Sequence, residues 1–316
     1  MADASGLLFI GDPHISARRP GRRTDPDFAA TSLDKLEQAL AIAAANGLWP
    51  VILGDLFDRA REDDHTVIVR TLRLLKAAPR RPFCLVGNHD RLHDRLSDDT
   101  ALGLLAETGA LHVIAESGPA ASLELAGRRI GLGGTPHGQD IPDSVDGLFP
   151  EAEAVVWLTH HDLAFGRPYP GAQPLRPIAG AALAVNGHMH GREAARPVGG
   201  TVWHNPGNIL RQSVDLRDHV PAVWSWRPGG PAELVEHRLR FTPDRFDLTG
   251  RLAQPISSGR SVFADLLKAE SQSEMGRSAD GAMLLEDIER LFDQERTGAD
   301  VQAILRDLHA RAVARG

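Results

Sequence analysis

Short apolar runs alternate with helical patterns along the first part of the chain. The runs at 7–10, 50–53 and 83–86 have the length and composition of buried strands. Between them, apolar residues recur at helical spacing after Ser32, which we expect to be an N-cap, and again over residues 67–75. This alternation predicts a layered α/β fold with helices over a sheet.

The apolar runs become more closely spaced after residue 110, where they read mainly as strands. The last two, 220–226 and 234–239, flank Pro228-Gly229-Gly230-Pro231, which predicts a hairpin. We therefore expect a second sheet, mostly antiparallel, packed against the first. The runs lie at 111–115, 122–125, 129–132, 154–158, 183–185, 201–204, 220–226 and 234–239.

The composition changes again after about residue 246. A loose linker at 252–259 precedes three helical patterns at 262–269, 283–292 and 299–312, and the last two carry apolar stripes among many charges. The predicted domains are accordingly 1–246 and 247–316, the second being a linker with a helical extension. Its stripes are suited either to binding a partner or to covering the first domain's own surface.

Composition limits the classes of protein that fit. Of 316 residues, 42% are hydrophobic and 24% charged, which is ordinary for a globular protein, and the net charge of −7 argues against a general polyanion binder. Cys84 is the only cysteine, so a disulfide framework is excluded and a reducing compartment fits. No signal peptide and no membrane-spanning run is recognisable. The expected location is the cytoplasm, with no membrane partner.

Polar side chains follow five of the apolar runs, at the point where each run ends. Ligands of open α/β sheets bind beyond the carboxyl ends of the strands, so these side chains are expected to converge. Taken singly, each segment has an ordinary explanation, such as a turn; their repetition at strand ends favours a site. The segments are Gly11-Asp12-Pro13-His14, Gly54-Asp55-Leu56-Phe57-Asp58, Gly87-Asn88-His89-Asp90, Thr159-His160-His161-Asp162 and Asn186-Gly187-His188-Met189-His190.

These residue types suit divalent metal ions. Carboxylate oxygens and imidazole nitrogens are typical ligands of manganese, iron or zinc. Asp12 and His14, like His188 and His190, are two residues apart and share one face of an extended segment, so each pair can grip one ion. Asp55 has two oxygens and could bridge two ions. Two ions about 3.5–4 Å apart form the usual arrangement for in-line attack on a phosphoester.

The order of the motifs resembles that of the calcineurin-like metallophosphoesterases. Their pattern is D-x-H, GDxxD, GNHD/E, a single H and GHxH. This chain reads DPH at 12–14, GDLFD at 54–58, GNHD at 87–90, H at 160 and GHMH at 187–190. The resemblance covers roughly residues 7–240 and implies a two-sheet α/β/β/α sandwich, here with a C-terminal helical extension.

The resemblance also implies roles for single residues. Two divalent ions are expected, manganese first, with iron, zinc or magnesium as alternatives. An activated water would attack, His89 would protonate the leaving oxygen, Asp90 would orient His89, and Asp58 would steady a ligand. His161 is the alternative to His160, because only one of two adjacent side chains points inward. The implied ligands are Asp12, His14, Asp55 and His190 for one ion, and Asp55, Asn88, His160 and His188 for the other.

Weaker features favour the SbcD-like DNA-repair exonuclease branch of this superfamily. The loops 133–138 and 205–221 resemble segments of that branch, and the helical tail resembles the part by which such nucleases dock on an SMC-like (SbcC-like) ATPase. DNA is therefore the expected substrate, and a homodimer is a further expectation. Arg18, Arg22 and Arg211 are the candidate phosphate contacts.

Two alternatives remain open at this point. One is a phosphodiesterase or phosphatase acting on small nucleotides or phosphoproteins, with the Pro- and Gly-rich loop 162–180 closing its pocket. Against DNA stand the acidic net charge and the lack of an obvious aromatic stacking platform, since Tyr169 is the only tyrosine. The other is a non-catalytic scaffold, which the complete set of expected ligands disfavours.

Overall fold

A computed structural model of the chain describes residues 4–92, 95–166, 171–229 and 234–248, and near the C-terminus residues 289, 292, 299, 301–303 and 305–307. The chain divides into two compact units. The first comprises Met1–Arg18, Asp27–Leu210 and His219–Phe241, and the second comprises Arg19–Pro26, Arg211–Asp218 and Thr242–Gly316.

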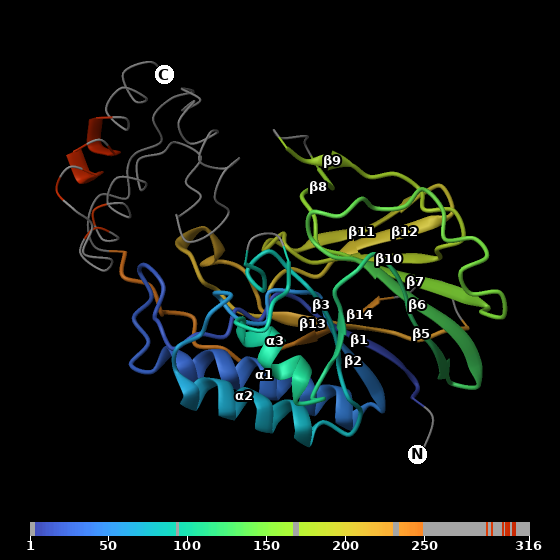
Figure 1. Cartoon of the computed structure of the whole chain (residues 1–316), viewed down its shortest axis with the longest axis horizontal. Coiled ribbons are helices and arrows are strands. Elements are labelled where there is room, and N and C mark those ends of the chain that lie inside the picture. Colours follow the sequence, from blue (N-terminus) through green and yellow to red (C-terminus); the bar gives the residue numbers. More distant parts are fainter. Residues whose placement is uncertain are drawn as a thin grey trace. The chain divides into compact units, whose positions relative to one another are not determined.

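One six-stranded sheet of the first unit has the order β14-β13-β1-β2-β3-β4 (Figure 1). Strands β1 to β4 are parallel, and β13 pairs antiparallel with β1. The predicted hairpin is confirmed as β13–β14, but it extends this sheet rather than the second one. The bounds are β1 Gly6–Ile10, β2 Leu48–Ile52, β3 Phe83–Leu85, β4 His112–Ile114, β13 Ala222–Trp226 and β14 Leu234–Arg238.

The other six-stranded sheet has the order β11-β12-β10-β7-β6-β5. The expectation of a mostly antiparallel sheet was wrong, because β12, β10, β7 and β6 pair in parallel and only the edge strands β11 and β5 are antiparallel. Short apolar runs alone do not distinguish the two pairings. The bounds are β5 Gly118–Leu125, β6 Arg128–Thr135, β7 Ala154–Thr159, β10 Leu183–Asn186, β11 Glu193–Val198 and β12 Thr201–Asn205.

Three helices, α1 Phe28–Ala45, α2 His65–Ala77 and α3 Ala101–Glu107, cover one face of the first sheet (Figure 1). Helix α1 begins a turn earlier than predicted. The Asp27 carboxylate accepts a hydrogen bond from the Ala30 amide and so caps the helix, whereas Ser32 lies inside it. The apolar faces of these helices bury against the strands and close the first core layer.

Two further apolar layers hold the second sheet in place. Between the sheets, side chains such as Phe9 of β1 and Leu132 of β6 are fully buried. On the outer face, Trp157 and Trp203 are covered by apolar residues of the loops at 141–149 and 163–178, which include the short strands β8 Leu163–Ala164 and β9 Gln173–Pro174. The predicted two-sheet α/β fold is confirmed, and among the described residues loops cover this outer face.

The described part of the second unit contains the 3-10 turn Val214–Leu216 and Phe246, whose ring centroid lies 5.1 Å from Cζ of Arg23 and 5.6 Å from Cζ of Arg211. The helix expected at 262–269 lies outside the described residues. In the other two predicted helices, the described positions 289, 292, 299, 301–303 and 305–307 are helical. No helix in the described parts of the chain is long and apolar enough to cross a membrane.

Candidate metal centre

The polar segments predicted from the sequence follow the carboxyl ends of strands β1, β2, β3, β7 and β10. Their backbone is unusual. Asp12, His14, Asp55 and His188 have φ values of 23°, 43°, 49° and 71°, and the only other described non-glycine residue with positive φ is Ala126 in a hairpin turn. Such backbone conformations are costly for residues with a side chain and cluster at functional sites. The strand ends are therefore held in a conformation that serves the site.

One cluster of potential ligand atoms lies between the two sheets' strand ends. Oδ1 of Asn88 lies 2.9 Å from Nδ1 of His188 and 3.2 Å from Nε2 of His160. The same Nε2 lies 3.2 Å from Oδ2 of Asp55. Ligand atoms around a divalent ion at about 2.1 Å from each lie about 3–3.5 Å apart. The spacing in this cluster therefore suits one ion.

The remaining ring nitrogens of this cluster are fixed by other groups. Nδ1 of His160 donates to the Leu53 carbonyl over 2.7 Å, and Nε2 of His188 lies 3.1 Å from a carboxylate oxygen of Asp162. Metal-binding histidines commonly donate their second N–H to a carbonyl or carboxylate in this way. His161 instead directs Nε2 to the Gln139 carbonyl, 2.8 Å away. The structure thus brings His160, not His161, into the cluster.

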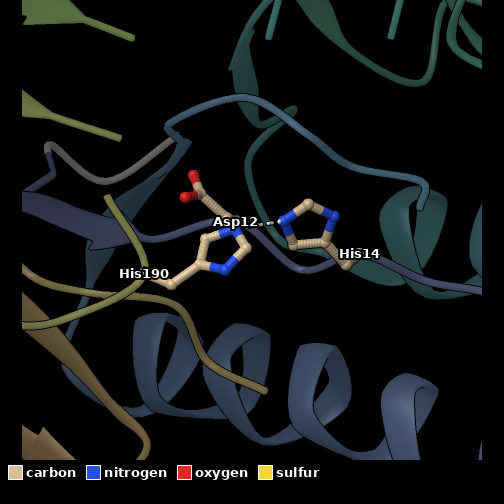
Figure 2. Close-up of side chains that lie close together, drawn as sticks. All are labelled: Asp12, His14 and His190. Atoms are coloured by element: carbon tan, nitrogen blue, oxygen red, sulfur yellow. Dashed lines mark hydrogen bonds between the residues drawn. The ribbon is translucent and has the colours of Figure 1, made fainter. Parts of the chain in front are cut away.

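A second cluster contains Asp12, His14 and His190 (Figure 2). The Nε2 atoms of His14 and His190 lie 3.0 Å apart, and His14 Nε2 lies 3.8 Å from Oδ2 of Asp55. Both carboxylate oxygens of Asp12 are buried without a hydrogen-bond partner. A buried carboxylate without partners is costly unless a cation neutralises it. The donor set of this cluster fits a divalent ion.

The charge balance of the two clusters supports cation binding. Burial raises the pKa of Asp12. Burial would also raise the pKa of Asp55, but the charges of His160 and His89 outweigh it and hold that pKa well below the usual value. The same pairing raises the pKa of His160 to about 9 against the effect of burial. Without metal, the clusters need protonated histidine as the countercharge that a cation would supply.

Asp58, His89 and Asp90 surround these clusters, and only Asp90 makes contacts other than those expected. Asp58 lies near His14, with 3.5 Å between Oδ1 and Nδ1. The carboxylate of Asp90 accepts hydrogen bonds from the amides of Asp55, Leu56 and Gly87, and not from His89. Asp90 therefore holds the loop that carries Asp55, and the expectation that it orients His89 is corrected. His89 is instead oriented by the Asp58 carbonyl oxygen, which lies 2.5 Å from Nδ1 of His89.

The three arginines expected to contact DNA differ in exposure. Arg18 is exposed, whereas Arg22 and Arg211 are buried. The guanidinium of Arg211 donates to the carbonyls of Arg217, Thr242 and Pro243, over 2.5–2.9 Å. This side chain therefore joins the backbone at Arg217 to the backbone at 242–243 through hydrogen bonds within the second unit. A phosphate contact by these arginines stays a prediction, and exposure favours Arg18.

His137 is a site residue that the sequence analysis missed. It follows β6, and its ring centroid lies 5.0 Å from that of His188 and 6.1 Å from that of His160. Burial and the charges of neighbouring histidines lower the pKa of His137 to about 3, so the ring is neutral. The available signal was the apolar run 129–132, which is followed by Gly133 and Gly134 and, three residues after Gly134, by this histidine.

Comparison with known families agrees with this geometry. The model of the family "Calcineurin-like phosphoesterase" matches residues 6–192, more than half of the chain. The chain belongs to this family. As a calcineurin-like phosphoesterase it is a metal-dependent phosphoric ester hydrolase, and its family typically binds two divalent metals. The coarser part of the sequence-based interpretation is thereby confirmed.

Solved structures provide more distant likenesses to this calcineurin-like phosphoesterase. A 5′-nucleotidase precursor from Thermus thermophilus is 14% identical, with a TM-score of 0.46 over 75% of this chain and 54% of that chain. The chain thus spans about half the length of that protein. A hypothetical protein from the same organism is 14% identical, with a TM-score of 0.44 over 74% and 98% of the two chains. A search of curated proteins gave no significant match.

Proposed function

We propose that the protein is a dinuclear-metal phosphodiesterase that cleaves DNA. The observation that carries the dinuclear site is the position of a single atom. Oδ2 of Asp55 lies 3.2 Å from Nε2 of His160 in one cluster and 3.8 Å from Nε2 of His14 in the other. One carboxylate therefore stands between two sets of ligands, as a bridging ligand of two ions would.

Seven side chains of the two clusters would hold the two ions. Asp12, His14 and His190 would hold one ion, and Asn88, His160 and His188 the other, with Asp55 shared. When bound, two divalent cations activate water at neutral pH and offset charge on the phosphoryl group. Asp162 fixes His188, Asp58 faces His14, and Asp90 holds the loop of Asp55.

His89 is suited to act as the general acid. It is half-buried, and its ring meets that of His14 edge-on at a centroid distance of 4.8 Å. Because its Nδ1 is directed to the Asp58 carbonyl, the other nitrogen is left to donate a proton to the leaving oxygen. The group that leaves is then an alcohol rather than an alkoxide, which lowers the barrier to cleavage.

DNA as the substrate rests on the loops at 133–138 and 205–221, which resemble the SbcD-like branch, and on the exposed Arg18 next to the first metal motif. The same resemblance supports an SMC-like ATPase bound through the C-terminal helices and a homodimer. Manganese is the expected metal, and the single cysteine supports a cytoplasmic location. The alternative substrates are small nucleotides and phosphoproteins, which the net charge of −7 favours.

The test compares substrates in the presence of Mn²⁺. Single-stranded DNA, double-stranded DNA and bis-p-nitrophenyl phosphate are each incubated with the protein, with and without excess EDTA. His89→Ala is the inactive variant, and His65→Ala, which removes an exposed histidine at the start of α2, is the matched control. We expect Mn²⁺-dependent DNA cleavage that His89→Ala lowers by about 100-fold or more and His65→Ala leaves unchanged.

Cleavage of the small diester with both DNA substrates intact would replace DNA by a small nucleotide as the substrate class. Cleavage that persists in EDTA, or that His89→Ala retains in full, would contradict the proposed mechanism.

A further inference from the structure

Three neighbouring strands of the second sheet end near a histidine. Strands β6, β7 and β10 lie side by side and parallel, so their carboxyl ends share one edge of the sheet. They lead into His137, His160 and His188 respectively. The last two belong to the ligand cluster described above. His137 holds the corresponding position after β6. It belongs to none of the groups of potential metal ligands found among the described residues.

Arg91 fixes the orientation of His137. One guanidinium nitrogen donates to the His137 carbonyl over 2.8 Å, and another donates to Nδ1 of the ring, also over 2.8 Å. Gly138, with φ +79°, leaves room for this contact, since a Cβ there would lie 3.3 Å from both terminal nitrogens of Arg91. The arginine fork thus holds the backbone and the ring of the same residue.

This contact decides which ring nitrogen carries the hydrogen. A guanidinium group has only donors, so Nδ1 of His137 must accept, and the hydrogen of the neutral ring is on Nε2. None of the described residues accepts a hydrogen bond from that Nε2–H group. His137 is half-buried, as are Asn88 and His89, whereas His160 and His188 are buried. His137 Nε2 has no partner in the described part of the chain and is not among the fully buried unpartnered atoms, so this open donor is accessible to solvent beside the centre.

We propose that His137 donates a hydrogen bond from Nε2 to a phosphoryl oxygen of the substrate, and that Arg91 is the positioning residue for this donor. The inference rests on the proposed phosphoester hydrolysis and names a residue that recognises the phosphoryl group beside His188. Hydrogen bonds to charged oxygen atoms are stronger than those between neutral groups. The donor adds no positive charge, which distinguishes it from a lysine or arginine contact.

The first experiment measures binding rather than turnover. Inorganic phosphate is titrated calorimetrically into the Mn²⁺-loaded protein, and bound metal is counted by mass spectrometry in the same samples. For His137→Leu we expect both metal ions to remain and phosphate binding to weaken about 10-fold to 100-fold. His137→Gln offers an amide N–H at nearly the place of Nε2 and should restore binding to within about 3-fold. His65→Leu, the exposed control, should bind as the wild type does.

A second arm tests the part of Arg91. Arg91→Leu should also weaken phosphate binding, but adding it to His137→Leu should cause no further loss, because it acts through the ring. A further loss in the double variant would show that Arg91 binds phosphate directly and would overturn its assigned role. Unchanged phosphate binding in His137→Leu with both metals present would overturn the proposal, as would loss of a metal ion, since His137 would then be a ligand.

These outcomes are separable from those of the proposed function. If the wild type hydrolyses no phosphoester but binds phosphate through His137, the proposed function fails and the recognition role stands. If it cleaves diesters while His137→Leu binds phosphate normally, the recognition role alone fails.

Discussion

Nδ1 of His160 donates a hydrogen bond to the carbonyl oxygen of Leu53 over 2.7 Å, which joins the end of β7 to the end of β2. This contact turns Nε2 of His160 toward Asp55 and Asn88. His161, the next residue, lies on the other side of the chain and accepts the His160 amide at Nδ1. Of these two adjacent histidines, His160 faces the proposed metal ligands, whereas His161 makes hydrogen bonds that hold the fold.

Substitution of each histidine should separate these tasks. We expect His160→Ala to lose about one of two bound Mn²⁺ ions and at least about 100-fold in kcat/KM. His161→Ala should keep both ions but melt at a lower temperature, because the Gln139 carbonyl loses its partner. Metal content after gel filtration and the melting temperature measure the two effects. Loss of metal from His161→Ala with His160→Ala fully loaded would reverse the assignment.

Much of this centre could be predicted from the sequence, for a physical reason. The ligands lie in short segments directly after apolar runs, and a run that ends in Asp or His is visible without a structure. His137 was missed because Gly133 and Gly134 continue β6 without apolar side chains, so its strand end was not apparent. The true role of Asp90 depends on amides of the 54–56 loop, contacts that leave no sequence pattern.

Strand pairing and arginine burial were also beyond the sequence. Whether β12 lies parallel to β10 depends on how the chain crosses between them, which hydrophobic alternation does not record. Arg211 is a candidate phosphate contact because it lies after the last family motif, and only the structure shows the carbonyls that accept its hydrogen bonds.

Gly187 packs closely against three parts of the metal centre. A Cβ at this position would lie 2.5 Å from the Leu53 carbonyl oxygen, 2.7 Å from Nδ1 of His160 and 2.8 Å from Oδ1 of Asp12. We expect Gly187→Ala to lower the free energy of unfolding by about 1–3 kcal/mol and to weaken Mn²⁺ binding. Chemical denaturation and metal titration measure these changes.

Gly191, four residues further along the same segment, provides the matched control. Nothing lies within 4 Å of a Cβ placed there, so Gly191→Ala should leave both measurements unchanged. If Gly187→Ala binds Mn²⁺ as the control does, the close approach of this backbone to the ligands has no bearing on the metal centre.

Arg211 should contribute to stability in a way that Arg18 does not. Removing a guanidinium that binds three carbonyls costs about 1.5–3 kcal/mol, so Arg211→Ala should lower the urea midpoint. Arg18→Ala replaces an exposed residue and should leave the midpoint nearly unchanged while weakening DNA binding at low salt. Weaker DNA binding by Arg211→Ala at an unaltered midpoint would instead show a direct phosphate contact.

His204 makes stability depend on pH at a place remote from the proposed ligands in the sequence. Its ring is 1% exposed and meets Trp224 edge-on, and burial lowers the pKa of His204 from 6.5 to about 4. In the unfolded chain, the His204 ring therefore becomes protonated below pH 6.5, whereas in the folded protein it stays neutral down to about pH 4. The stability from this residue is complete above pH 6.5 and is lost as the pH falls toward 4.

At pH 5 the loss from His204 should be about 2 kcal/mol relative to pH 7.5. His204→Phe keeps an aromatic ring against Trp224 but cannot titrate, so its free energy of unfolding should fall by about 2 kcal/mol less than that of the wild type between these two pH values. Urea unfolding of metal-free protein at both pH values gives the comparison, with the exposed His65→Gln as the control. Equal losses in His204→Phe and the wild type would mean that the acid sensitivity comes from other histidines.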